Sequence, residues 1–349
     1  MLFSILILLV AIHVMRKCAS SFDIAASYLT RNLGEGIKGP TINAVASSLP
    51  ELLISSMFLF YFKDIKGFSA GYGTIIGSSA FNIALIPVIS FVYLYITKGK
   101  DKVFQINKRI VKQDALFLLG SISILSLGFF IGVNFYLALL LILFYFVYIF
   151  YVLKTRVDKK DKQFIKNHNL ELSDKITHVE AGSFLSSLFN FKLFRIFFKG
   201  NVTSLTSTLV VLISVFIIGG SCYLLVLATE NISHILGINL FFGAFIIAAI
   251  ASSIPDTIFS IQDAKNDKFI DSFSNAYGSN IFDICIGIGL PVLVYSSIYG
   301  PINMNMPIER IGWIGDSVLG GNLFMWSLLI LFFFTALVSL VYYKRNLTL

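Results

Sequence analysis

Three carboxylates, Glu51, Asp256 and Asp283, interrupt otherwise apolar stretches of the sequence. A charged side chain is costly inside a membrane-spanning segment, so its presence there indicates a functional site. Carboxylate, amide and hydroxyl oxygens suit hard cations such as Ca²⁺, whereas zinc and copper prefer nitrogen and sulfur ligands. The three acids therefore predict a cation site within a membrane.

Hydroxyl side chains accompany these acids at helical spacing. A spacing of three or four residues places two side chains on one helix face. The pairs are Ser47 and Ser48 before Glu51, Ser252 and Ser253 before Asp256, Ser279 before Asp283, and Ser78 before Asn82. Pro50 and Pro255 cannot donate to the carbonyls four residues earlier, in Ala46 and Ala251, which predicts broken helices with freed backbone oxygens.

These polar positions belong to an internal repeat, which four hexads define. The segment ASSLPE at 46–51 recurs as ASSIPD at 251–256, and GSSAFN at 77–82 recurs as GSNIFD at 278–283. Five predicted membrane helices precede the second copy. An odd number of crossings inverts one copy relative to the other, so the sequence predicts an inverted-topology repeat with its site near the bilayer midplane.

The composition agrees with a membrane protein. Charged residues make up 13% of the 349 residues and hydrophobic residues 56%, whereas soluble domains carry about 25% charged residues. This excludes a soluble enzyme and a disordered chain. Hydropathy predicts nine helices, at 3–31, 37–62, 69–97, 114–131, 133–153, 205–233, 238–262, 271–298 and 320–343. The expected fold is an all-α polytopic membrane protein with two inverted five-helix repeats and nine or ten transmembrane helices.

One long hydrophilic stretch divides the chain. We expect a first repeat half at 1–153, a cytoplasmic basic loop with an interfacial helix at 154–204, and a second half at 205–349. With the N-terminus outside, the cytoplasmic loops hold 22 of the 27 cations, as the positive-inside rule requires. That rule accounts for the net charge of +8 without a nucleic-acid partner.

At its hexads the sequence resembles the cation/Ca²⁺ exchanger superfamily of Na⁺/Ca²⁺ exchangers. The repeats of that family read G-[TS]-S-x-P-[ED] and, about 30 residues later, G-S-x-x-x-[ND], which match the regions 39–90 and 243–292 of this chain. The resemblance implies ion ligands at Glu51, Asp256, Asp283, Asn82, Ser47, Ser48, Ser252, Ser253, Ser78 and Ser279, with backbone oxygens near Ala44 and Ala249. The second motif is similar to the K⁺-dependent branch, although K⁺-independent members also carry its final acid.

Two features depart from the family pattern. Alanine at 46 and 251 replaces the usual glycine, and serine at 47 and 252 replaces threonine, which keeps the hydroxyls but narrows the space beside the backbone. Only one clear helix follows Asp283, whereas the family usually has ten in all. Either the tenth helix is missing, or residues 300–319 contain a short one.

The predicted function is a secondary antiporter in the cell membrane, which exchanges Ca²⁺ for Na⁺ by alternating access. Exchange with and without K⁺ co-transport both remain open. The first and sixth helices would be its moving gates. A proton-coupled or other-cation exchanger is the main alternative; a cation channel and an intramembrane aspartyl protease using Asp256 and Asp283 are more remote. No enzymatic activity or cofactor is expected. The substrates are Ca²⁺ and Na⁺, the surrounding partner is the lipid bilayer, and the sequence leaves the oligomeric state open.

Overall fold

The computed structural model describes residues 1–29, 31, 44–98, 108–156, 184–265, 269–303 and 320–344. Within these residues, eight helices are long and apolar enough to cross a membrane, and the shorter apolar helix Leu49–Phe62 adds a ninth apolar segment. The predicted all-α polytopic membrane fold is confirmed. A tenth helix within 300–319 cannot be placed, because 304–319 lie outside the described residues.

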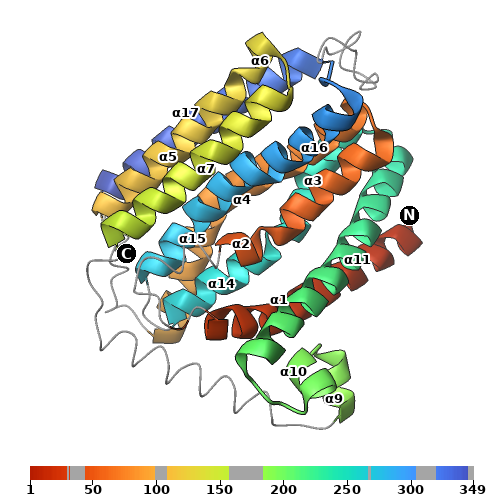
Figure 1. Ribbon diagram of the computed structural model, residues 1–349, viewed down its shortest axis with the longest axis vertical. Coiled ribbons are helices and arrows are strands. Elements are labelled where there is room, and N and C mark those ends of the chain that lie inside the picture. The colour runs from red at the N-terminus through yellow and green to blue at the C-terminus, as the bar shows by residue number, and fades with distance from the viewer. Residues whose placement is uncertain are drawn as a thin grey trace.

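The first half runs through α1 to α7 (Figure 1). Its helices are α1 (Leu2–Leu29), α2 (Ala44–Ser47), α3 (Leu49–Phe62), α4 (Ile65–Lys98), α5 (Lys108–Ser126), α6 (Gly128–Ile131) and α7 (Phe135–Arg156). The helix predicted from 114 begins at Lys108 instead, because Lys and Arg side chains can extend a membrane helix into the headgroup layer while their charges stay solvated. The start of the helix predicted at 37 lies outside the described residues.

Two short helices, α9 (Phe184–Phe189) and α10 (Leu193–Phe198), precede the second half in the chain. Its elements are α11 (Ser204–Leu236), α12 (Leu240–Gly243), the π-helix η2 (Ala244–Ala248), α13 (Ala249–Ser252), α14 (Ile254–Lys265), α15 (Phe269–Phe282), the π-helix η3 (Asp283–Ile288), α16 (Gly289–Tyr299) and α17 (Gly320–Lys344). The helices expected at 238–262 and 271–298 are thus present, but each contains a π-helical segment that the sequence did not predict.

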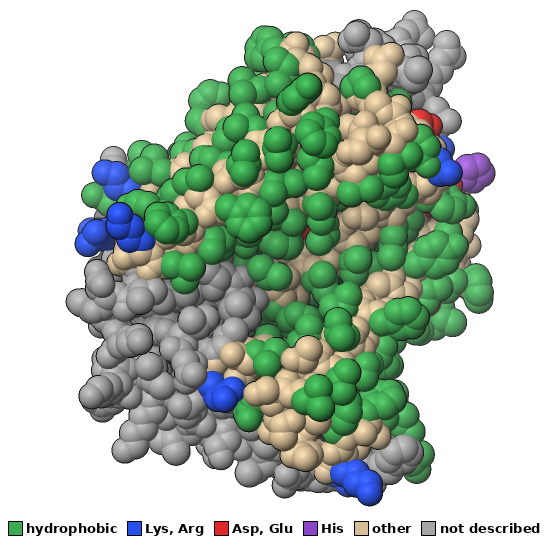
Figure 2. Space-filling view, viewed as in Figure 1, with side chains coloured by type: hydrophobic (Ala, Val, Ile, Leu, Met, Phe, Trp, Pro, Cys, Tyr) green, Lys and Arg blue, Asp and Glu red, His purple; other side chains and the backbone are tan. Residues whose placement is uncertain are grey.

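The helices that carry the hexads form the centre of the bundle. There α4 packs against α3, α14 and α15, and α14 also packs against α15. The long helices α1 and α11 lie side by side along one flank, and α5, α7 and α17 lie on the other (Figure 1). The hydrophobic side chains in Figure 2 cover the middle of the helices, while Lys and Arg side chains gather at their ends, as expected for a protein surrounded by lipid.

Glycines let α4 approach its neighbours closely. A Cβ added at Gly71 would lie 2.9 Å from the Cα of Ser55 in α3, and one at Gly73 would lie 2.8 Å from the carbonyl oxygen of Phe241 in α12. A Cβ at Gly77 would collide with the carbonyl oxygen of Phe245 in η2. Small residues allow such backbone contacts between membrane helices, and here they hold α4 between elements of both halves.

The segment before α11 docks onto α1. The Lys17 ammonium donates a 2.6 Å hydrogen bond to Oδ1 of Asn190, and the Ser21 hydroxyl donates a 2.6 Å bond to the carbonyl of Phe191. Phe191 has a positive φ of 49°, which separates α9 from α10 where the sequence predicted one interfacial helix. Lys17, a cation within the first membrane helix, thus has a polar partner at this junction.

Candidate cation-binding site

The structure brings all twelve predicted site residues together in the bundle core. Each has an exposed fraction of 0 or 1%. The first hexad of each half spans a helix break, between α2 and α3 or between α13 and α14, and the second hexads lie on α4 and at the junction of α15 with η3. The site is therefore closed to solvent in this conformation.

The helix breaks fall at Ser48 and Ser253, just before the prolines. Pro50 and Pro255 are each the second residue of the helix after the break, where a missing N–H leaves no hydrogen bond unmade. The broken helices predicted from the two prolines are therefore present, and each break lies on the N-terminal side of its proline.

The backbone oxygens at Ala44 and Ala249 are equivalent in the two halves. The Ala44 carbonyl accepts hydrogen bonds from the backbone N–H of Ser48 at 3.0 Å and the hydroxyl of Ser47 at 3.3 Å. The Ala249 carbonyl accepts the matching bonds from Ser253 at 3.0 Å and Ser252 at 3.2 Å. Each carbonyl therefore already uses both acceptor lone pairs, so a cation at either carbonyl would compete with the serine hydroxyl.

Hydrogen bonds join the four hexads. The Ser78 hydroxyl lies 3.1 Å from Oε1 of Glu51, to which it donates, and 2.8 Å from the hydroxyl of Ser253. The Asn82 amide donates to Oδ2 of Asp256 at 3.0 Å. One helix of the first half, α4, therefore contacts acids from both halves.

The contacts of the acids cross between the repeats. Ser252 of the second half adjoins the carboxyl group of Glu51, and Ser47 of the first half adjoins that of Asp256. Asp256 also adjoins Ser279, as Glu51 adjoins Ser78. Glu51 and Asp256 thus each have a hydroxyl neighbour from their own half and one from the other, which is the arrangement that an inverted repeat produces.

Asp283 differs from its counterpart Asn82. It is the first residue of η3, its side chain is fully buried and adjoins Ser48, and neither of its carboxyl oxygens has a hydrogen-bond donor. π-helical segments often occur at functional sites. Within the described residues, no three acidic, His or Cys side chains are close enough to bind one metal ion together, so hydroxyl, amide or backbone oxygens must complete any coordination shell.

Several buried acceptors in the site have no donor. They are Oε2 of Glu51, Oδ1 of Asp256, both carboxyl oxygens of Asp283 and the amide oxygens of Asn82 and Asn275. The hydroxyl and amide side chains that contact the three acids are neutral, the charged neighbours of Glu51 and Asp283 are other acids of the site, and the part of the chain that is described contains no buried Lys or Arg. Because a buried charge requires a partner, this set of oxygens suits a bound cation.

Sequence reasoning missed two asparagines beside the site. Asn280 accepts a 3.1 Å hydrogen bond from the Asn82 amide and donates a 3.0 Å bond to the carbonyl of Ser79. Asn275 donates to the carbonyl of Asp256 at 3.5 Å and to the hydroxyl of Ser260 at 3.2 Å. The signal for Asn280 lay inside its own hexad, and Asn275 precedes Ser279 by four residues.

The count of three intramembrane acids was too low. Asp23, Asp114 and Asp263 are also buried within helices that can cross a membrane. Asp114 accepts hydrogen bonds from the hydroxyls of Tyr148, at 3.3 Å, and Ser274, at 3.0 Å. It thereby links α5 to α7 and α15, and the sequence missed it because the predicted helix started at that residue.

Comparison with known proteins gives a consistent family. The fold is similar to the sodium-calcium exchanger NCX_Mj soaked with 10 mM Na⁺ and 10 mM Sr²⁺, with a TM-score of 0.58 and 17% identity over 99% of this chain and 92% of that one. Sodium/potassium/calcium exchanger 2 is 34% identical over 85 residues in Gallus gallus and 36% identical over 77 residues in Homo sapiens. These matches cover 24% and 22% of this chain but only 13% and 12% of the relatives.

The family model described as sodium/calcium exchanger protein matches residues 3–154 and 206–348, which include all four hexads. These two segments make up most of the chain. The protein therefore belongs to the sodium/calcium exchanger family of integral, multi-pass membrane proteins.

Proposed function

We propose that the protein is a secondary antiporter that exchanges Ca²⁺ for Na⁺ at the site formed by the four hexads. The observation that carries this proposal is the set of neighbouring buried carboxylates that have no buried Lys or Arg beside them among the described residues and that retain oxygens without donors. Oxygen ligands of this kind bind Ca²⁺ and Na⁺, the ions named in the descriptions of the family and its relatives.

Charge compensation supplies a physical basis for exchange. In an empty site, the carboxylates of Glu51 and Asp256 would lie near each other in a low-dielectric interior without a counter-ion, which is unfavourable. Binding of Ca²⁺ or of Na⁺ removes that cost. The loaded protein would therefore change conformation more readily than the empty one, so that after one ion is released the other must bind before the site can return to the first side.

Alternating access requires that the closed site open to each side in turn. We assign the moving gate to α1 and α11, which pack mainly on each other. The arrangement is reciprocal, because α1 contacts α14 of the second half and α11 contacts α3 of the first. Movement of the pair as a unit would expose first one set of hexads and then the other.

We assign any K⁺ co-transport to Asp283. Its carboxyl group is buried without a hydrogen-bond donor, whereas the equivalent Asn82 is neutral and is hydrogen-bonded to Asp256. Asp283 therefore has capacity for an additional monovalent ion. We place the protein in the cell membrane, where a Na⁺ gradient could drive Ca²⁺ movement.

The test is Ca²⁺ uptake into Na⁺-loaded proteoliposomes with external Na⁺, K⁺ and H⁺ varied in turn. Uptake should require internal Na⁺ and saturate with Ca²⁺. Glu51→Gln and Asp256→Asn should each abolish uptake, because the bound cation would lose one of its carboxylate partners. Removing one partner of a buried charge pair costs about 3–5 kcal/mol, or at least a hundredfold in affinity. Glu230→Gln, on the partly exposed surface of α11, is the matched control and should remain active.

The same measurements separate the alternatives. Uptake that follows a pH gradient without Na⁺ would indicate a proton-coupled exchanger, and bulk conductance without counterflow would indicate a channel. Normal Na⁺-dependent uptake by both acid variants would refute the proposed site.

A further inference from the structure

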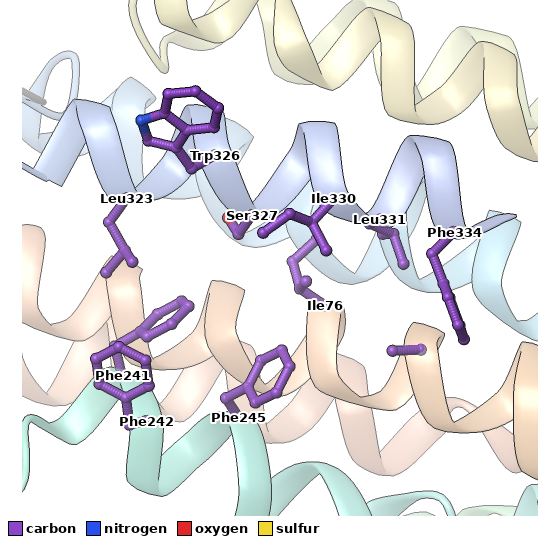
Figure 3. Close-up of a pocket in the computed structure, with 11 residues that line it drawn as sticks. Ile76, Phe241, Phe242, Phe245, Leu323, Trp326, Ser327, Ile330, Leu331 and Phe334 are labelled. Carbon is purple, nitrogen blue, oxygen red and sulfur yellow. The ribbon is translucent and has the colours of Figure 1, made fainter.

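An apolar groove lies between α17 and the α12–η2 segment, over α4 (Figure 3). Its volume is about 350 Å³. Trp326, Ile330 and Phe334 line the α17 side, and Phe241 and Phe245 line the opposite side (Figure 3). Ala80 of α4 also lines the groove. Ala80 belongs to the hexad at 77–82, but none of the proposed ion ligands lines the groove, and no step of ion exchange uses it.

The mouth of the groove faces the lipid. Trp326 is 62% exposed and Ile330 is 67% exposed, and both lie within Asn322–Tyr343, a segment long and apolar enough to span the membrane. The groove also lacks an available polar partner. The hydroxyl of Ser327, which reaches its lining, lies 2.6 Å from the Tyr72 hydroxyl and donates to the carbonyl of Phe324 at 2.9 Å.

Such a site favours a hydrocarbon ligand. Apolar cavities do not hold ordered water, because water needs polar partners. The groove runs from Leu323 to Phe334, which corresponds to about 16 Å along the helix axis at 1.5 Å per residue. The hydrocarbon core of a bilayer is about 30 Å thick, so the groove has the length of the hydrocarbon layer of one leaflet.

We propose that this groove binds one acyl chain of a bilayer lipid. The bound chain would fill the space between α17 and the phenylalanines of α12 and η2. Those phenylalanines belong to the segment whose backbone carbonyls pack on Gly73 and Gly77 of α4, and η2 continues into α13, which carries Ala249 and Ser252. The lipid would thus support the packing of one wall of the hexad region from outside the protein.

Binding can be measured without transport, so the proposal does not depend on the proposed function. The chain has two tryptophans, at 313 and 326, and Trp313→Phe leaves Trp326 as a single fluorescent probe at the groove. The purified variant in detergent would be titrated with phosphatidylcholine carrying bromine atoms on one acyl chain, because bromine quenches tryptophan on contact. We expect quenching that saturates at one lipid per protein.

Ala80→Phe places a ring in the groove. It should raise the lipid concentration needed for half-maximal quenching at least tenfold. Val88→Phe is the matched control and should leave that concentration unchanged. Val88 lies two turns further along α4, is 43% exposed and does not line the groove. Native mass spectrometry of wild type and Leu323→Phe provides a second measurement if Ala80→Phe does not fold. Quenching that never saturates, or one retained lipid bound equally by the groove variants, would overturn the proposal.

Discussion

Replacing Asn82 with aspartate would place a second carboxylate beside Asp256. In the structure the Asn82 amide nitrogen lies 3.0 Å from Oδ2 of Asp256 and 3.1 Å from the amide oxygen of Asn280. The substitution puts an oxygen where this donor is, so an attraction becomes a repulsion. Two unit charges 3.0 Å apart repel by about 5 kcal/mol at an effective dielectric constant of 20.

A shared proton would relieve that repulsion, as it does when two carboxyl groups share a site. Ca²⁺ would then have to displace the proton in order to bind. If Ca²⁺ competes with one proton, the apparent Ca²⁺ affinity of Asn82→Asp should rise about tenfold for each pH unit while the pair still holds its proton. This pH dependence adds to any that the wild type has from Glu51, Asp256 and Asp283.

The assay is the concentration of Ca²⁺ for half-maximal uptake in proteoliposomes from pH 6 to pH 9. Asn82→Ala is the control, because it removes the same amide without adding a charge and should weaken Ca²⁺ binding with no added pH dependence. If the curves of Asn82→Asp and wild type stay parallel across this range, the proximity of residues 82 and 256 during transport is refuted.

Three other predictions test separate parts of the structure. Asp283→Asn should retain some Na⁺-driven Ca²⁺ uptake but lose dependence on K⁺ or pH, and ion-dependence curves identical to wild type would remove Asp283 from ion binding. Gly77→Ala should impair uptake strongly, because its Cβ would collide with the carbonyl of Phe245. Gly120→Ala should have a mild effect on uptake, because the nearest neighbour of its Cβ, at 2.8 Å, is the end of a phenylalanine ring. Equal uptake by the two variants would contradict the packing argument. Asp114→Asn should lower stability by about 1–3 kcal/mol, since one hydroxyl donor loses its acceptor, and an unchanged thermal unfolding temperature in detergent would refute this.

Some features of the site could be predicted from local sequence, and others could not. Glu51, Asp256 and Asp283 were recognisable because an acid within an apolar segment is costly wherever the helices pack. Their serine neighbours followed from the helical repeat. Asp114 was missed for a local reason, because its helix begins six residues before the predicted start, at Lys108, and this brings Asp114 into the helix interior.

The sequence by itself determined the membrane class, the inverted repeat and the oxygen-bearing side chains of the candidate site, because hydropathy, the order of the hexads and residue spacing can all be read along the chain. Only the tertiary structure decided that Ser47 adjoins Asp256 while Ser252 adjoins Glu51, and that Asn82 donates to Asp256. Those contacts depend on the rotation and separation of helices from different halves. The close approach at Gly77 constrains the rotation and the separation of α4 and η2. The spacing of residues along one helix gives neither the rotation nor the separation.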